Sequence, residues 1–250
     1  MTRFTNRLRA LGWGAYEYFA MGWGLSALAL LGVVSLPLAL ALMVLPTPIR
    51  IPMGRRLIAR TLAFYLGFLR VFCAVRIDAS GLHSLQTSRP LIVVANHPSL
   101  LDAVILLSML PHAACVMKGS LKRNMFVGPM TRLSGYLDNR DPMSLVRRAC
   151  EELEAGAQVL LFPEGTRTRH GPISPFGEAA ALISARSGVP VQTLIIAFDK
   201  PYLGKGWSLF KKPSLPLRIT VKPGLRFDPP RNRLVLTGKL ESFYRGVLET

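Results

Sequence analysis

Short apolar runs alternate with amphipathic stretches over residues 88–225 of the chain. The runs are rich in aliphatic residues and have the length of strands that are covered on both faces. The stretches between them have apolar positions at helical spacing. The predicted strands are Leu91–Ala95, Ala113–Met117, Tyr136–Asp138, Gln158–Leu161, Val191–Ile196 and Arg218–Val221. One predicted helix begins at Ser99, and three others cover Pro142–Glu154, Gly177–Arg186 and Leu234–Leu248. The alternation predicts an α/β fold in which a mixed, mostly parallel sheet is flanked by helices.

Capping signals support two of these helices. Asp141 is a good N-cap residue, and Pro142 fits the first helical turn that follows it. Gly188 comes directly after another predicted helix, where a glycine commonly ends the helix.

The first third of the chain has a different pattern, with no charged residue between Tyr18 and Ile49. Its apolar core, Phe19–Leu45, exceeds the ~20 residues that cross a bilayer. Pro37 interrupts this run and Pro46 closes it, so a kinked spanning helix and two shorter helices that dip into one leaflet both fit. A secretory signal fits less well, because its apolar region is typically ~7–15 residues long.

The net charge of +17 is concentrated after this apolar run. Six arginines lie between the end of this run and the next acidic residue, Asp78, and they alternate with aromatic and aliphatic side chains. This pattern is typical of a basic amphipathic helix at a membrane surface, and further arginines at positions 3, 7 and 9 place both flanks in the cytoplasm. A solvated basic face without lipid is the simpler alternative. No nucleic-acid-binding motif is present that would explain the charge instead. We therefore predict a membrane-anchoring helical region over residues 1–80, followed by an α/β domain over residues 81–250.

Three scattered cysteines, Cys73, Cys115 and Cys150, share no metal-ligand or redox spacing. This usage indicates reduced thiols in a cytosolic compartment.

Two loops that follow predicted strands carry the candidate chemistry. The first is Asn96-His97-Pro98-Ser99-Leu100-Leu101-Asp102. Asp102 either caps the helix by accepting a hydrogen bond from the Ser99 N–H, or it orients the His97 imidazole as a general base. The chain has no Gly-x-Ser-x-Gly elbow and its histidines (83, 97, 112 and 170) have no metal-ligand spacing, which favours direct attack by a substrate hydroxyl and no metal.

The second loop is Phe162-Pro163-Glu164-Gly165-Thr166-Arg167. Arginine is well suited to binding phosphate in a bidentate way. Arg140 and Lys118 follow two other predicted strands. Because ligands bind beyond the carboxyl ends of strands in open α/β sheets, we expect one base and three cations to share one crevice.

The spacing of these motifs resembles that of the glycerolipid acyltransferase family. The resemblance rests on His-x4-Asp, the segment Gly135–Arg140, Phe-Pro-Glu-Gly-Thr-Arg and Val189-Pro190-Val191, in this order over about residues 90–200. It implies His97 as catalytic base, Asp102 as its orienting partner, and substrate binding by Lys118, Arg140, Glu164, Gly165, Thr166 and Arg167. One departure is Phe176-Gly177-Glu178, where relatives often have basic residues after the phenylalanine.

The resemblance further implies acyl transfer from acyl-CoA or acyl carrier protein to a lipid hydroxyl, with no other cofactor. We therefore predict a membrane-bound O-acyltransferase of phospholipid biosynthesis, most simply one that converts lysophosphatidic acid to phosphatidic acid on the cytoplasmic face of a bacterial inner membrane. Two alternatives stay open: the same chemistry on an acceptor without glycerol phosphate, such as a lyso-aminolipid or a hydroxylated metabolite, and a catalytically inactive lipid-binding protein. No nucleic-acid partner is expected.

Overall fold

The computed structural model describes residues 2–124, 127–169, 171–208 and 211–249, with side chains from residue 12 onward. The arginines at positions 3, 7 and 9 and His170 therefore lie outside the described side chains. In chain order the elements are α1 (Thr2–Leu42), α2 (Thr47–Phe72), β1 (Val75–Asp78), η1 (Ser80–Leu85), β2 (Leu91–Ala95), α3 (Leu101–Met109), β3 (Ala113–Met117), η2 (Gly119–Arg123), α4 (Gly128–Leu133), β4 (Leu137–Asp138), α5 (Pro142–Glu154), β5 (Gln158–Leu161), α6 (Ala179–Ser187), β6 (Val191–Phe198), β7 (Leu217–Phe227) and α7 (Arg233–Leu248).

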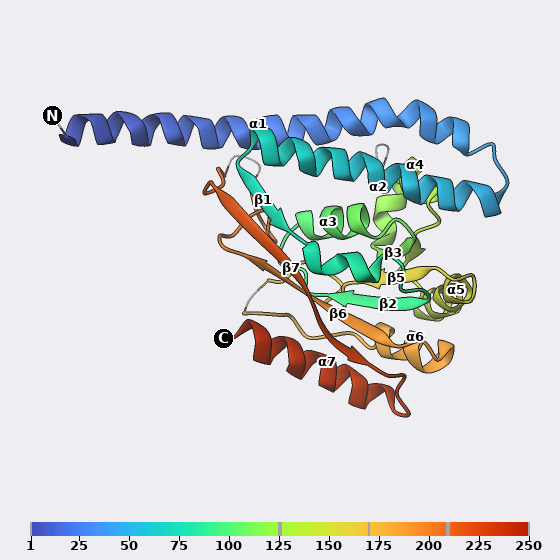
Figure 1. Cartoon of the computed structure of the whole chain (residues 1–250). Coiled ribbons are helices and arrows are strands. Elements are labelled where there is room, and N and C mark those ends of the chain that lie inside the picture. Colours follow the sequence, from blue (N-terminus) through green and yellow to red (C-terminus); the bar gives the residue numbers. More distant parts are fainter. Residues whose placement is uncertain (1, 125–126, 170, 209–210, 250) are drawn as a thin grey trace.

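One sheet of seven strands organises the molecule, in the order β1-β7-β6-β2-β5-β3-β4. All neighbouring strands are parallel except β6 and β7, which pair antiparallel. The prediction of a mixed, mostly parallel sheet flanked by helices is confirmed (Figure 1). The carboxyl ends of β2, β3, β4 and β5 consequently meet at one edge of the sheet.

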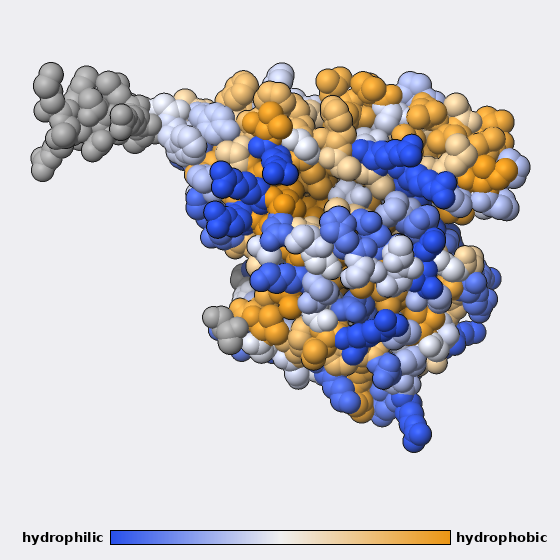
Figure 2. All heavy atoms as spheres, in the orientation of Figure 1, coloured by the Kyte–Doolittle hydropathy of each residue, from blue (hydrophilic) through white to orange (hydrophobic). Residues whose placement is uncertain are grey.

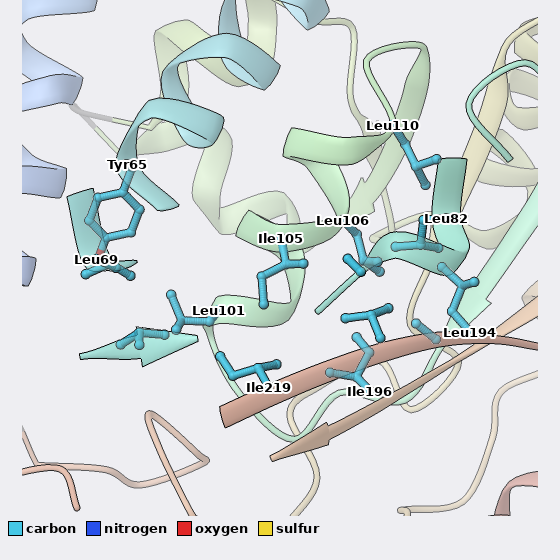
Figure 3. Close-up of a cluster of buried hydrophobic side chains, with 14 of the residues drawn as sticks. Tyr65, Leu69, Leu82, Leu101, Ile105, Leu106, Leu110, Leu194, Ile196 and Ile219 are labelled. Atoms are coloured by element: carbon cyan, nitrogen blue, oxygen red, sulfur yellow. The ribbon is translucent and has the colours of Figure 1, made fainter. Parts of the chain in front are cut away.

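The central strand β2 is buried on both faces, which explains its unbroken apolar sequence. Leu91, Val93 and Ala95 face a core that α2 and α3 cover, and Figure 3 shows part of this cluster. Ile92 and Val94 face a second core beneath α5, α6 and α7. The two cores hold the sheet rigid between layers of helices, so the loops at its edge start from fixed positions.

Helices α1 and α2 form a hairpin that covers the α3 side of the sheet (Figure 1). α1 continues through Pro37 to Leu42, and the chain reverses before α2 starts at Thr47. Within the described residues, Gly12–Leu42 is long and apolar enough to cross a bilayer, by length and composition alone. Many large apolar side chains of α1 are exposed, including Leu30 and Val34, and they gather along the upper rim of the molecule in Figure 2.

Most predicted elements match the observed ones closely. β2, β3, β5 and α5 have the expected bounds, Asp141 caps α5, and Gly188 ends α6 with a left-handed φ of 68°. α3 begins at Leu101 rather than Ser99, α6 covers Ala179–Ser187 and β6 runs on to Phe198, each a shift of one or two residues. Two other differences are larger. β7 runs to Phe227 instead of ending at residue 221, and Val75–Asp78 pairs with β7 in the sheet, so the helical region ends at Phe72 rather than near residue 80. The three cysteines lie buried as free thiols.

Candidate active site

His97 and Asp102 lie together just past the carboxyl end of β2. His97 Nδ1 is 2.9 Å from Asp102 Oδ2, and the Ser99 N–H donates to the same oxygen at 2.7 Å. Ser99 Oγ accepts a hydrogen bond from the Leu101 N–H at the start of α3. The contacts that both interpretations of Asp102 require are thus present in one carboxylate, which accepts the Ser99 N–H and contacts the imidazole.

Asp102 is fully buried, with a relative exposure of 0%. Burial raises the pKa of Asp102 to about 6, against the opposing effect of the His97 hydrogen bond and charge and of the Ser99 N–H. An ionised Asp102 requires the proton of a neutral His97 to sit on Nδ1, which leaves Nε2 free to accept a proton. The imidazole stacks on Phe162 with ring centroids 4.1 Å apart, so its plane is fixed from a second side.

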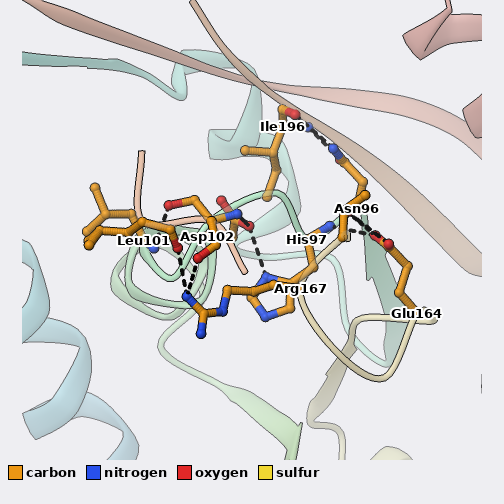
Figure 4. A network of polar contacts seen from close by, with 11 residues as sticks. Asn96, His97, Leu101, Asp102, Glu164, Arg167 and Ile196 are labelled. Atoms are coloured by element: carbon orange, nitrogen blue, oxygen red, sulfur yellow. Dashed lines mark hydrogen bonds and ion pairs between the residues drawn. The ribbon is translucent and has the colours of Figure 1, made fainter. Parts of the chain in front are cut away.

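Glu164 joins the two motif loops to each other. Its Oε1 accepts the backbone N–H of His97 at 3.0 Å, and its Oε2 accepts the Ser174 N–H at 2.8 Å. The Thr168 hydroxyl bonds the same carboxylate, and the Thr168 N–H donates to the His97 carbonyl. Figure 4 shows Glu164 beside His97. Glu164 is buried, so its role in the structure is to hold the backbone of His97 in place.

The turn at Gly165 requires a glycine, because its φ of 65° lies in the left-handed region. After this turn, Arg167 Nη1 donates to the carbonyls of Leu203 at 2.8 Å and Gly204 at 2.9 Å (Figure 4). The Leu203 carbonyl also accepts the Leu100 N–H at 3.1 Å. Leu203 itself has a φ of 48°, which is rare for a leucine. Arg167 thus holds a strained turn of the β6–β7 loop against the loop that carries His97.

A cavity of about 490 Å³ opens beside Gly165 and Thr166. Its cationic lining residues come from four loops and are Lys118, Arg123, Arg140, Arg169 and Lys205. Burial, and then Arg169, Arg167 and Lys118, hold the pKa of Lys205 below its usual value, as expected where like charges crowd together.

Two of these cations have protein partners. Arg140 Nη2 lies 2.6 Å from Asp138 Oδ2, and Lys205 Nζ donates to Thr166 Oγ1 at 2.7 Å. The other three, Lys118, Arg123 and Arg169, form no ion pair with any carboxylate in the described part of the chain. The cavity therefore has unbalanced positive charge, which suits a phosphate group.

The structure brings the sequence-predicted residues into two neighbouring groups. His97, Asp102 and Glu164 form one polar network, and Lys118, Arg140, Gly165 and Thr166 line the cationic cavity. Arg167 does not line that cavity. Among the described residues, no three His, Cys, Asp or Glu side chains are grouped to hold a metal ion.

Sequence reasoning missed Arg123, Arg169 and Lys205. Arg169 lies two residues beyond the second motif and could have been found there, whereas the β6–β7 loop that carries Lys205 has no motif. The segment Phe176-Gly177-Glu178 lies near α7 instead. The Phe176 ring packs edge-on against Tyr244, and Glu178 pairs with Arg233 at 2.8 Å. The cationic cavity thus gets its charge from other loops than the segment where the departure occurs.

Comparisons with known proteins find similarity to acyltransferases. The Acyltransferase family model matches residues 76–197, which include both motif loops. A chloroplastic 1-acyl-sn-glycerol-3-phosphate acyltransferase, BAT2 from Brassica napus, is 32% identical over 49% of this chain and 38% of its own length. The human 1-acyl-sn-glycerol-3-phosphate acyltransferase alpha is 26% identical over 72% of this chain and 66% of its own length. The chain thus spans less than two thirds of either relative.

A solved structure has the same fold along nearly the whole chain. The crystal structure of the 1-acyl-sn-glycerophosphate acyltransferase PlsC from Thermotoga maritima matches with a TM-score of 0.62 and 22% identity. The match covers 97% of this chain and 96% of that one, so the helical hairpin and the sheet domain occur together in both.

Proposed function

We propose that the chain is an O-acyltransferase of the glycerolipid acyltransferase family and that it transfers a fatty acyl group to the hydroxyl of lysophosphatidic acid. The proposal is supported by the match to the Acyltransferase family model and by the similarity to 1-acyl-sn-glycerol-3-phosphate acyltransferases. The observation that carries this proposal is the 2.9 Å contact between His97 and a buried Asp102 at the sheet edge that also holds the cationic cavity.

In the proposed reaction, His97 Nε2 takes the proton of the acceptor hydroxyl while Asp102 stabilises the imidazolium that forms. The acceptor oxygen attacks the thioester carbonyl of acyl-CoA or acyl carrier protein. The tetrahedral intermediate then collapses, the carbon–sulfur bond breaks, and the imidazolium returns its proton to the leaving thiolate. The products are the new ester and the free thiol, and no covalent acyl-enzyme is formed.

The cationic cavity supplies the acceptor's binding energy. Lys118, Arg123 and Arg169 are free to pair with a phosphate dianion, and Arg140 can share its guanidinium between that phosphate and Asp138. The sequence predicted that Arg167 binds the phosphate directly. Since its Nη1 group is taken by two carbonyls, we propose that Arg167 contributes mainly by positioning the Leu203 turn.

The hairpin of α1 and α2 places the site at a membrane in this proposal. Its exposed apolar side chains and the arginines of α2 suit the boundary between acyl chains and head groups, where both greasy substrates are found. We propose the cytoplasmic face, as the arginines on both sides of the apolar run indicate.

Acyl transfer by the purified chain in non-ionic detergent tests the chemistry. His97→Ala should lose at least a hundredfold in kcat, since general bases contribute ~10²–10⁴ to rates. His83→Ala is the matched control, because His83 is exposed on η1 and should leave the rate unchanged. A folded His97→Ala variant that keeps more than a tenth of the activity would remove His97 as the base.

The acceptor is tested by comparing lysophosphatidic acid with a monoacylglycerol, which lacks the phosphate. The double variant Lys118→Gln, Arg169→Gln should raise KM for lysophosphatidic acid at least tenfold and leave KM for the monoacylglycerol unchanged. Equal use of both acceptors by the unaltered protein would instead favour an acceptor without glycerol phosphate.

A further inference from the structure

A second cavity lies at the opposite edge of the sheet from the active site. We call this cavity of about 580 Å³ the basal cavity. Its walls include the residues just before three strands, namely Arg89 before β2, His112 before β3 and Ala157 before β5, and its rim is the first two turns of α2. The length of β2 separates it from the active site by roughly 15 Å, at ~3.3 Å per residue.

The acidic residues of the basal cavity are already paired. Glu152 Oε2 lies 2.8 Å from Nη2 of the buried Arg55, whose Nε donates to the Ser134 carbonyl. Glu151 lies 3.8 Å from Arg147 on the exposed face of α5. Both acidic lining residues thus have an arginine partner, Arg55 from within the lining and Arg147 from outside it, and among the described lining residues no other carboxylate is present to neutralise the remaining cations.

Three further arginines line the same cavity, Arg56 from α2, Arg89 from the loop before β2 and Arg148 from α5. None of them forms an ion pair with a carboxylate within the described ranges. Burial, followed by the charges of Arg89, Arg56 and Arg55, lowers the pKa of His112, which places that imidazole among the arginines in a neutral state. Unpaired cations that converge on one concave site have the chemistry of a phosphate receptor.

The surface beside the cavity is apolar. Val44, in the turn between α1 and α2, is 87% exposed, and Ile49 and Met53, in the first two turns of the helix that borders the cavity, are 52% and 40% exposed. A free phosphate has no use for such a border. A phospholipid does, because its acyl chains can lie against these side chains while its phosphate enters the cavity.

We propose that the basal cavity binds a phosphate group, and that its occupant is the head group of an anionic phospholipid from the membrane on which α1 and α2 lie. This inference rests on the proposed function only for the placement of the hairpin at a membrane. Such a site would attach the edge of the protein that is remote from catalysis, so that both ends of the hairpin contact lipid.

Flotation with vesicles tests the proposal on the full chain. Vesicles of phosphatidylcholine alone are compared with vesicles that contain phosphatidylcholine and phosphatidylglycerol in a 4:1 ratio, at fixed ionic strength. Phosphatidylglycerol should raise the vesicle affinity of the unaltered protein, and we call this increase the anionic-lipid gain. In the triple variant Arg56→Gln, Arg89→Gln, Arg148→Gln, this gain should be smaller by up to roughly 100-fold. A control with the same loss of charge, Arg226→Gln, Arg231→Gln, Lys239→Gln, changes exposed residues of β7, the β7–α7 loop and α7 and should keep that gain.

A second variant distinguishes binding in the cavity from general attraction between the positively charged surface and the anionic vesicle. Ala155 is exposed and lines the cavity, so Ala155→Phe narrows it while every charge is kept. We expect this variant to lose at least tenfold of the anionic-lipid gain. Wild-type binding by Ala155→Phe, an equal loss in the triple variant and its control, or no gain in the unaltered protein would each overturn the proposal.

Two further measurements identify the occupant and isolate the proposal. If millimolar inorganic phosphate at constant ionic strength abolishes the anionic-lipid gain, the occupant is free phosphate and the lipid assignment is overturned. Acyl transfer in detergent is measured on the same preparations. Missing acyl transfer in the unaltered protein would refute the proposed function, whereas a missing vesicle gain in an active protein would refute the basal site alone.

Discussion

Replacing Asp102 with asparagine should separate the stability of the fold from its chemistry. Burial raises the pKa of Asp102 from 3.8 to about 6. Each pKa unit corresponds to ~1.4 kcal/mol, so ionising this carboxyl in the folded chain costs about 3 kcal/mol more than in the unfolded chain. The folded state binds the proton more tightly, so the free energy of unfolding falls as pH rises from about 4 to about 6 and then stays level.

The asparagine variant cannot ionise and should lack this fall. Its amide oxygen can still accept the Ser99 N–H, while its amide nitrogen takes the position of Oδ1, a buried oxygen without a hydrogen-bond partner. A buried unpaired N–H costs ~1–3 kcal/mol. At pH 8 the variant should therefore be as stable as the unaltered protein or up to ~2 kcal/mol more stable, and at pH 4 it should be less stable. Its kcat should fall by ~10³–10⁴, because an amide cannot stabilise the imidazolium.

Urea unfolding in non-ionic detergent at pH 4, 6 and 8, together with acyl transfer, measures both effects. Asp78→Asn is the control, since hydrogen bonds from Ser80 lower the pKa of Asp78 and confine its influence to pH values below about 4. A difference in unfolding free energy between Asp102→Asn and the unaltered protein that stays constant from pH 4 to pH 8 would refute the buried-charge reasoning. More than a tenth of the activity in a folded variant would refute the orienting role.

Three other substitutions have distinct expected outcomes. Glu164→Gln replaces an acceptor oxygen with a donor and should lower the free energy of unfolding by ~1–3 kcal/mol, measured by urea unfolding, with kcat at least tenfold lower. Arg167→Lys can keep only part of the hydrogen bonding to the Leu203 and Gly204 carbonyls, so kcat should fall by a larger factor than KM for lysophosphatidic acid rises. A change in KM alone would assign Arg167 to binding of the phosphate instead. Glu17→Ala removes the carboxylate of α1 that accepts hydrogen bonds from Lys212 and from the Leu215 N–H. Limited proteolysis should then cleave the β6–β7 loop at least tenfold faster. Unchanged cleavage would show that Glu17 does not hold this loop.

The centre of the sheet could be predicted because burial on both faces leaves a direct mark on the sequence. β2 and β5 are covered by helices on either side, so their residues form apolar runs that end where the strands end. The strands at the periphery of the sheet could not be predicted in this way. β1 has the polar residues Arg76 and Asp78 and β7 contains Pro223, and their pairing depends on neighbouring strands rather than on local pattern.

The active site divides in the same way. His97 and Asp102 are five residues apart, in the loop after β2 and in the first turn of α3. Their contact therefore follows from local geometry. The partners of Arg167 could not be foreseen, because Leu203 and Gly204 lie in a loop that is brought near only by the antiparallel pairing of β6 with β7. A guanidinium in a motif looks the same in sequence whether its partner is a substrate phosphate or a backbone carbonyl.

The β6–β7 loop physically connects α1 to the candidate active site. On the α1 side, Glu17 Oε1 accepts the Leu215 N–H at 2.9 Å, and the Tyr202 hydroxyl lies 3.6 Å from Met21 Sδ. On the catalytic side, the same loop supplies the carbonyls that bind Arg167 and the Lys205 amine that lines the cationic cavity. Because these contacts form one continuous chain, the phosphate cavity has a fixed position relative to α1. In the proposed reaction, an acceptor whose single acyl chain lies along α1 would therefore present its phosphate at that level only.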